Sequence, residues 1–272
     1  MREKNVSRLT KRFDSLKQKG EKALIAYVTA GDPTPESSAE VILAVAKAGA
    51  DAIEIGVPFS DPLADGPSIQ ASSQRALEKG MTTRKALEIV RQVRAEAPDL
   101  PLVLMTYFNP ILHFGLTEWA AEAKAAGVDA HIVTDLTPEE AEPWKRESDK
   151  NGLETIFLLA PTSTPARIEI VAKLSSGFIY CVSRTGVTGA RQDIPEELTE
   201  VVARIKARTS EPVCVGFGIS KPEHVRRIAQ FSDGAVVGSL LVDLIHKHRE
   251  DPYLMEAISA CISELKAATR GR

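Results

Sequence analysis

The stretch Ala48-Gly49-Ala50-Asp51-Ala52 returns later in the sequence as Ala126-Gly127-Val128-Asp129-Ala130. In both copies an alanine-rich, helix-like segment ends at a glycine, and an apolar, strand-like run begins at the aspartate or directly after it. An internal echo of this kind indicates that one helix-to-strand unit is repeated along the chain.

Eight short apolar runs, rich in β-branched residues, predict β-strands. Amphipathic stretches between them predict helices, and several of these open with a proline in the first turn, where its missing N–H is harmless. The predicted strands cover residues 23–29, 52–57, 102–106, 129–133, 153–159, 178–182, 212–215 and 234–237. The predicted helices cover residues 35–48, 82–96, 117–126, 138–150, 165–174, 195–207 and 221–230.

Strand and helix alternate throughout, which favours parallel strands joined by right-handed crossovers. Eight such units in 272 residues favour an α/β fold closed into a single (β/α)8 TIM barrel over an open, doubly wound sheet. No flexible linker divides the sequence, so we expect one domain over residues 1–272. Extra helical segments are expected at 2–19, where a helix would plug the barrel's bottom, and at 253–268, with a long connection at 58–80.

Composition excludes several classes of function. The 34 basic and 37 acidic residues give a net charge of −3, which offers no positive field to nucleic acid or to an anionic membrane. No apolar run is long enough to span a bilayer, and the charged stretch 1–22 does not resemble a signal peptide, so we expect a cytoplasmic protein without a membrane or nucleic-acid partner. The three cysteines and five histidines are not spaced as metal ligands, so no metal site is expected.

The second predicted strand carries a carboxylate on its inner face. Side chains alternate along a strand, so Ile53, Ile55 and Val57 should face the helices while Glu54 points into the barrel. Burying an ionised carboxylate is costly unless a cation, a substrate proton or a raised pKa compensates. The other strand runs contain no basic residue, which favours a catalytic role for Glu54 over pairing with a core lysine or arginine.

A second carboxylate follows on the loop that leaves this strand. Asp65 lies in a segment punctuated by Pro62, Gly66 and Pro67, at the carboxyl end of the strand, where barrels build their active sites. For Asp65 alone, a structural role in the turn before Gly66 is an equal alternative. Together, Glu54 and Asp65 indicate a pair of carboxylates at the barrel's mouth.

Glycines gather after the last three predicted strands. They are Gly186 and Gly189, then Gly216 and Gly218, then Gly238 followed by Ser239. Unobstructed backbone amides and the start of a short helix at Ser239 suit a phosphate dianion, and barrels commonly bind phosphate at this place. The pattern favours a phosphate ester as substrate over a set of tight turns.

Carboxylates facing a phosphate ester indicate carbon–carbon or carbon–hydrogen chemistry. The predicted strands contain no lysine for a Schiff base, and their ends show no cluster of histidine and carboxylate ligands for a metal. Cleavage by proton transfer alone remains.

Longer motifs carry a resemblance to a known family. Ile53-Glu54-Ile55-Gly56-Val57-Pro58-Phe59-Ser60-Asp61-Pro62-Leu63-Ala64-Asp65-Gly66-Pro67 resembles the signature of the tryptophan synthase α subunit family. Further similar segments are Thr29-Ala30-Gly31-Asp32-Pro33, Tyr107-Phe108-Asn109-Pro110, Ser183-Arg184-Thr185-Gly186-Val187-Thr188-Gly189 and Val215-Gly216-Phe217-Gly218-Ile219-Ser220. They span nearly the whole chain.

The resemblance implies a lyase of L-tryptophan biosynthesis that splits indole-3-glycerol phosphate into indole and D-glyceraldehyde 3-phosphate. It implies that Glu54 and Asp65 are the catalytic pair. It also implies a set of binding positions: Tyr180, Tyr27, Met105 and Thr188 for the substrate, and Gly189, Gly218, Gly238 and Ser239 for its phosphate.

The resemblance further implies that this chain needs no cofactor and works with a β subunit that carries pyridoxal phosphate, in an α2β2 tetramer. The loop 184–193 is the expected lid over the site. The sequence departs from the family at Leu136-Thr137-Pro138, which puts the detail of the partner interface at Thr137 in doubt.

Two other readings stay open. Another phosphate-binding barrel enzyme, such as a sugar-phosphate isomerase or the enzyme that forms indole-glycerol phosphate, would need a strand lysine or paired aspartates that this sequence lacks. A barrel kept only as an activator of a partner subunit would not need Glu54 and Asp65.

Overall fold

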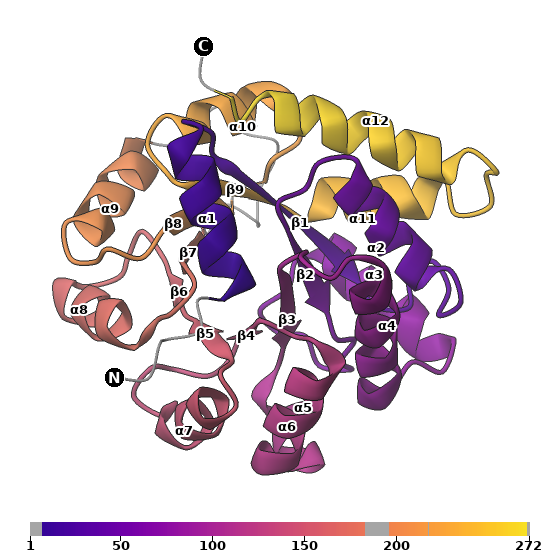
Figure 1. Ribbon diagram of the computed structural model, residues 1–272, viewed down its shortest axis with the longest axis horizontal. Helices are drawn as coiled ribbons and strands as arrows, with labels where there is room; N and C mark the ends of the chain where they lie inside the picture. The colour runs from indigo at the N-terminus through magenta and orange to yellow at the C-terminus, as the bar shows by residue number, and fades with distance from the viewer. Residues whose placement is uncertain (1–6, 183–195, 217, 271–272) are drawn as a thin grey trace.

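The computed structural model describes residues 7–182, 196–216 and 218–270. Within them, nine parallel strands form one sheet in the order β5-β4-β3-β2-β1-β9-β8-β7-β6, and the helices pack around it (Figure 1). The strands are β1 (Ala23–Thr29), β2 (Ala52–Gly56), β3 (Leu102–Thr106), β4 (Ala130–Val133), β5 (Glu154–Ile156), β6 (Leu158–Leu159), β7 (Ile179–Val182), β8 (Val213–Gly216) and β9 (Gly234–Val237).

The two edge strands of this sheet, β5 and β6, are halves of one predicted strand. Only Phe157 separates them, and its carbonyl oxygen accepts a hydrogen bond of 3.0 Å from the Tyr180 amide on β7. The ring of strands therefore closes, and the predicted (β/α)8 barrel with extra helices is confirmed. The open doubly wound sheet is wrong.

All seven helices predicted between the strands are present, with shifts at their ends. The helices that were predicted within the repeating units are α2 (Ser38–Lys47), α4 (Thr83–Glu96), α6 (Leu116–Ala126), α7 (Glu142–Lys150), α8 (Pro165–Leu174), α9 (Glu196–Lys206) and α10 (Pro222–Ala229). Helix α7 begins four residues later than predicted. Pro143 lies in its first turn, and a helix begun at Pro138 would have put Pro143 in its interior, where the ring blocks a backbone hydrogen bond.

The described residues form five further helices around these units: α1 (Arg8–Gln18), α3 (Pro67–Glu78), α5 (Phe108–Phe114), α11 (Ser239–Lys247) and α12 (Leu254–Ala267). Helix α3 fills most of what was predicted only as a long connection, and it starts at Pro67 with Gly66 as its N-cap. Helix α5 was not predicted. Ser7 caps α1 by accepting the Thr10 amide, and residues 2–6 of the predicted first helix lie outside the described residues.

The barrel separates two apolar cores. Ile53, Ile55 and Val57 pack in the outer core between strands and helices, whereas Ala52 belongs to the core inside the barrel, as the alternation predicted. Leu9, Phe13 and Leu16 of α1 belong to the inner core, and Figure 1 shows α1 lying across the barrel. The predicted plug at the barrel's bottom is confirmed.

The repeated aspartate ties neighbouring strands together at this end. Asp51, before β2, donates its amide to the Leu24 carbonyl of β1 and accepts the Leu24 amide on its carboxylate, both at 2.8 Å. Asp129 makes the same two bonds to Leu102, both at 2.9 Å. Asp233 does so with Val213, and Ser176 does so with Thr155 through its hydroxyl. The echo in the sequence is therefore a strand clamp, used at every second strand of the barrel.

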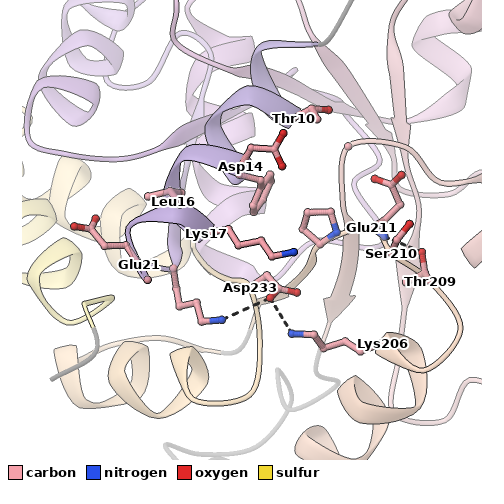
Figure 2. Close-up of a pocket in the computed structure, with 15 residues that line it drawn as sticks. Thr10, Asp14, Leu16, Lys17, Glu21, Lys206, Thr209, Ser210, Glu211 and Asp233 are labelled. Carbon is pink, nitrogen blue, oxygen red and sulfur yellow. Dashed lines mark hydrogen bonds and ion pairs between the residues drawn. The ribbon is translucent and has the colours of Figure 1, made fainter. Parts of the chain in front are cut away.

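Cations neutralise the three aspartates of these clamps. Arg8 of α1 and Arg94 of α4 both contact Asp129 at 2.9 Å, and Lys266 of α12 contacts Asp51 at 2.9 Å. Lys206 and Lys22 pair with Asp233 (Figure 2). The plug and the outer helices are thus held to the strands by charge as well as by apolar packing.

Among the described residues no helix is both long and apolar enough to cross a membrane. The cytoplasmic location stays a prediction, as does the single domain.

Candidate active site

A cavity of about 160 Å³ opens at the carboxyl ends of the strands. It brings together most of the site residues expected from the sequence: Glu54, Asp65, Tyr27, Met105, Tyr180, Gly218, Gly238 and Ser239. Thr188, Gly189 and the expected lid 184–193 lie outside the described residues.

Glu54 is buried in this cavity without a compensating charge. Its side chain lies between Tyr27 of β1 and Val103 of β3 in the sheet register, and the residue is 1% exposed. Within the described residues its Oε1 atom has no hydrogen-bond partner, and none of the ion pairs includes it. Burial raises the pKa of Glu54 to about 8, so the carboxyl group holds its proton at neutral pH.

Asp65 is half-buried on the loop between β2 and α3. Its amide donates to the Pro62 carbonyl at 3.0 Å, and the side-chain amide of Gln70 on α3 donates to the Asp65 backbone carbonyl at 2.9 Å, so the backbone is held on both sides. Burial raises the pKa of Asp65 to about 6, and a hydrogen bond from Tyr107 opposes the rise. The two carboxyl groups of the cavity therefore have pKa values on either side of 7, which suits one as acid and the other as anion.

Tyr107, at the end of β3, positions Asp65. Its hydroxyl accepts the Ala64 amide at 3.0 Å and hydrogen bonds to the Asp65 carboxylate, while its ring lies 5.2 Å from that of Phe59. Tyr107 belongs to one of the motifs that resemble the family, but no role was predicted for it. Its place directly after a barrel strand was the signal that could have found it.

Two of the glycines give room to tyrosine rings. A Cβ atom at Gly56 would collide with the Tyr27 hydroxyl, and one at Gly216 would collide with the Tyr180 ring and hydroxyl. Gly216 was expected among the phosphate-binding glycines, but packing against Tyr180 already explains it. Ile69, Ile219 and Val236 also line the cavity and were not predicted.

Gly218 and Gly238 differ from these glycines. A Cβ atom at Gly218 would meet nothing within 4 Å, and one at Gly238 would meet only the Tyr27 Cβ at 3.8 Å and Ile69 Cδ1 at 3.9 Å. Neither position is crowded, so contacts with neighbouring atoms do not require glycine there. Gly238 is also the N-cap of α11, whose dipole favours an anion. Both positions leave open room beside the cavity that an anionic group could occupy.

Comparison with known proteins shows which family this chain resembles. The family model described as tryptophan synthase alpha chain matches residues 13–270. The alpha chain of Solibacter usitatus is 48% identical over 261 residues, which is 96% of this chain and 97% of that protein. The corresponding chain of Geobacter sp. strain M21 is 49% identical over the same shares.

The chain belongs to the tryptophan synthase alpha chain family. Solved structures agree with this assignment. Tryptophan synthase subunit alpha from Legionella pneumophila has a TM-score of 0.91 and 36% identity, covering 97% of this chain and 98% of that one. A chain of Mycobacterium tuberculosis tryptophan synthase has a TM-score of 0.91 and 37% identity, covering 98% and 100%. The resemblance seen in the sequence is confirmed.

A larger cavity, of about 520 Å³, lies at the end of the barrel opposite Glu54 and Asp65. Phe13 and Lys17 of α1 line it together with Pro212 and Asp233 (Figure 2). It holds neither Glu54 nor Asp65, and barrel enzymes use the opposite end for catalysis.

Within the described part of the chain, no group of three or more histidine, cysteine or acidic residues could hold a metal ion.

Proposed function

We propose that Glu54 and Asp65 perform the reaction of the alpha chain in this protein, the cleavage of indole-3-glycerol phosphate to indole and D-glyceraldehyde 3-phosphate. The observation that carries the proposal is the buried, unpaired Glu54, with a pKa of about 8, in one cavity with Asp65, whose pKa is about 6. At pH 7 the first group is therefore an acid and the second an anion.

Each carboxyl group has one task in the reaction. Indole is a poor leaving group as a carbanion, so Glu54 first gives its proton to C3 of the ring, and the positive charge that develops at the ring nitrogen is stabilised by the Asp65 carboxylate. Glu54, now ionised, then takes the proton of the glycerol hydroxyl as the carbon–carbon bond breaks. The electron pair of that bond restores the indole ring, the aldehyde forms, and Glu54 is protonated again.

The rest of the cavity binds the two ends of the substrate. Gly218, Gly238 and Ser239, together with Gly189, would hold the phosphate, because small residues leave room beside the start of α11. The ring would lie among Tyr27, Met105 and Tyr180, which line the cavity. The fourth member of the expected substrate set, Thr188, lies outside the described residues. This arrangement puts the ring at the carboxylates and the phosphate at β8 and β9.

Turnover of indole-3-glycerol phosphate by Glu54→Gln tests the assignment. The amide keeps the shape of the side chain but cannot cycle a proton, so we expect kcat to fall by about 10³-fold or more, within the range of a lost general acid–base group. Glu256→Gln, the same change at an exposed position of α12, serves as the control and should keep full activity. Substantial turnover by Glu54→Gln would remove Glu54 from the mechanism. An inactive unsubstituted chain would instead favour the reading in which the barrel only activates a partner.

We further propose that the chain acts without a cofactor of its own and docks a β subunit that carries pyridoxal phosphate, in an α2β2 tetramer. The loop after β2 supports a docking role, because Leu63 is 93% exposed there and Asp65 follows two residues later. Thr137, exposed on the loop after β4, would lie near this interface. A partner that fixes the loop would also fix the carboxylate, which raises kcat rather than affinity.

Assays of indole formation with and without β subunit, combined with sedimentation of the isolated chain, test this coupling. We expect a weakly active monomer alone and a higher kcat in the complex. A rate that does not change on complex formation would contradict the coupling while leaving the cleavage itself in place.

A further inference from the structure

A chain of three hydroxyl groups runs from α3 to the wall of the cavity. The Thr29 hydroxyl hydrogen bonds to the Tyr27 hydroxyl at 3.3 Å and to the Ser72 hydroxyl at 2.6 Å. Ser72 in turn donates to the Ile69 carbonyl at 2.8 Å, one turn earlier in α3. All three hydroxyl-bearing residues are buried. The Tyr27 side chain is therefore anchored at its far end to an element on the outside of the barrel.

The anchored end of Tyr27 lies next to the carboxylates. Tyr27 pairs with Glu54 in the register of β1 and β2, and its ring passes over Gly56, which leaves no room for a side chain. Burial raises the pKa of Tyr27 well above its ordinary value, and the nearby Asp65 and, to a smaller extent, Glu54 raise it further. The phenol therefore stays neutral, as part of the wall of the cavity that Glu54 and Asp65 also line.

We propose that Tyr27 is a specificity-determining residue whose hydroxyl, held by Thr29 and Ser72, limits the aromatic ring of the substrate to unsubstituted indole. The proposal rests on the proposed function, because a ring that receives a proton from Glu54 and charge stabilisation from Asp65 must lie at this end of the cavity. A wall held by a hydrogen bond cannot swing aside for a larger ring, and Gly56 offers it no space behind. One additional methyl group against such a wall typically lowers kcat/KM by about 10–200-fold.

Two substitutions separate the wall from its anchor. Tyr27→Phe removes only the hydroxyl, and Thr29 can still bond to Ser72, so the fold should be kept. Thr29→Val keeps the Tyr27 hydroxyl but releases it. Tyr253→Phe, the same change at a residue that is 67% exposed, is the matched control.

The measurement is kcat/KM for indole-3-glycerol phosphate and for its analogues methylated at ring positions 4, 5, 6 and 7. We expect Tyr27→Phe to raise the ratio of methylated to unmethylated substrate about tenfold for at least one position. Thr29→Val should change the same ratio in the same direction by less, and Tyr253→Phe should leave it unchanged. If Tyr27→Phe lowers kcat/KM by the same factor for every substrate, the hydroxyl has only a structural role and the proposal is overturned.

Binding of free indole and the four methylindoles to the same variants gives the ratio again as Kd values. These do not depend on turnover, so an inactive chain, which would contradict the proposed function, still leaves the specificity proposal to be decided by the binding ratios.

Discussion

Replacing Glu54 by glutamine should make the protein more stable, and increasingly so as the pH rises. The pKa of this carboxyl group is 4.5 in its ordinary state and about 8 in the folded chain, because burial penalises the charged form. Between these values the folded chain keeps the proton while the unfolded chain releases it. Stability is therefore lost as the pH rises from 4.5 through 8, by about 1.4 kcal/mol for each pH unit.

The size of the effect follows from the two pKa values. A difference of about 3.5 units corresponds to about 5 kcal/mol at pH 9, of which about 3 kcal/mol is already present at pH 7. Glutamine does not titrate, so Glu54→Gln escapes this loss. Between pH 5 and pH 9, the free energy of unfolding of the variant should gain about 4 kcal/mol relative to that of the unsubstituted chain.

Urea unfolding at pH 5, 7 and 9 measures this gain, with Glu256→Gln on the surface of α12 as the control for the substitution itself. The combination of higher stability and lost turnover is the signature of a residue kept for chemistry. A stability difference that stays constant from pH 5 to pH 9 would refute the reasoning, because it would mean that Glu54 titrates alike in the folded and unfolded chains.

Three further changes test other parts of the structure. Asp129→Asn removes the charge that Arg8 and Arg94 contact, so it should lower the free energy of unfolding, measured by urea titration, by about 3 kcal/mol. The control Asp149→Asn breaks the surface ion pair with Lys145 and should lower it by under about 1 kcal/mol. Phe13→Ala should cost about 3–5 kcal/mol, because it empties the plug inside the barrel next to Phe178. Tyr107→Phe should lower kcat/KM about tenfold or more. It should also move the acidic limb of the pH profile, which belongs to Asp65, to higher pH, because the hydrogen bond that lowers the pKa of Asp65 is lost. An acidic limb at the same pH would show that Tyr107 only packs against Phe59.

The fold and the position of Glu54 could be predicted because both depend on local periodicity. Alternation along the second strand places Glu54 inside the barrel whatever its neighbours are, and the echo of Asp51 in Asp129 marks repeating units before any contact is known. The absence of lysine and arginine from the strands was enough to indicate that Glu54 has no core partner.

The parts that escaped prediction depend on contacts between distant segments. Tyr107 meets Ala64 across 43 positions of sequence, and Thr29 meets Ser72 across the same separation. No local sequence pattern predicts such contacts, because they depend on how two loops and a helix pack at the mouth of the barrel. The predicted start of α7 was wrong for a different reason. Pro138 and Pro143 could each lie in the first turn of a helix, but a helix that starts at Pro138 would place Pro143 in its interior.

The pH dependence of kcat/KM for indole-3-glycerol phosphate tests the central claim most directly. The mechanism needs Glu54 protonated and Asp65 ionised, so activity should rise through about pH 6, reach a maximum near pH 7, and fall through about pH 8. A rate that keeps rising to pH 9, or that is highest at pH 5, would contradict the assignment of Glu54 as the acid and Asp65 as the anion.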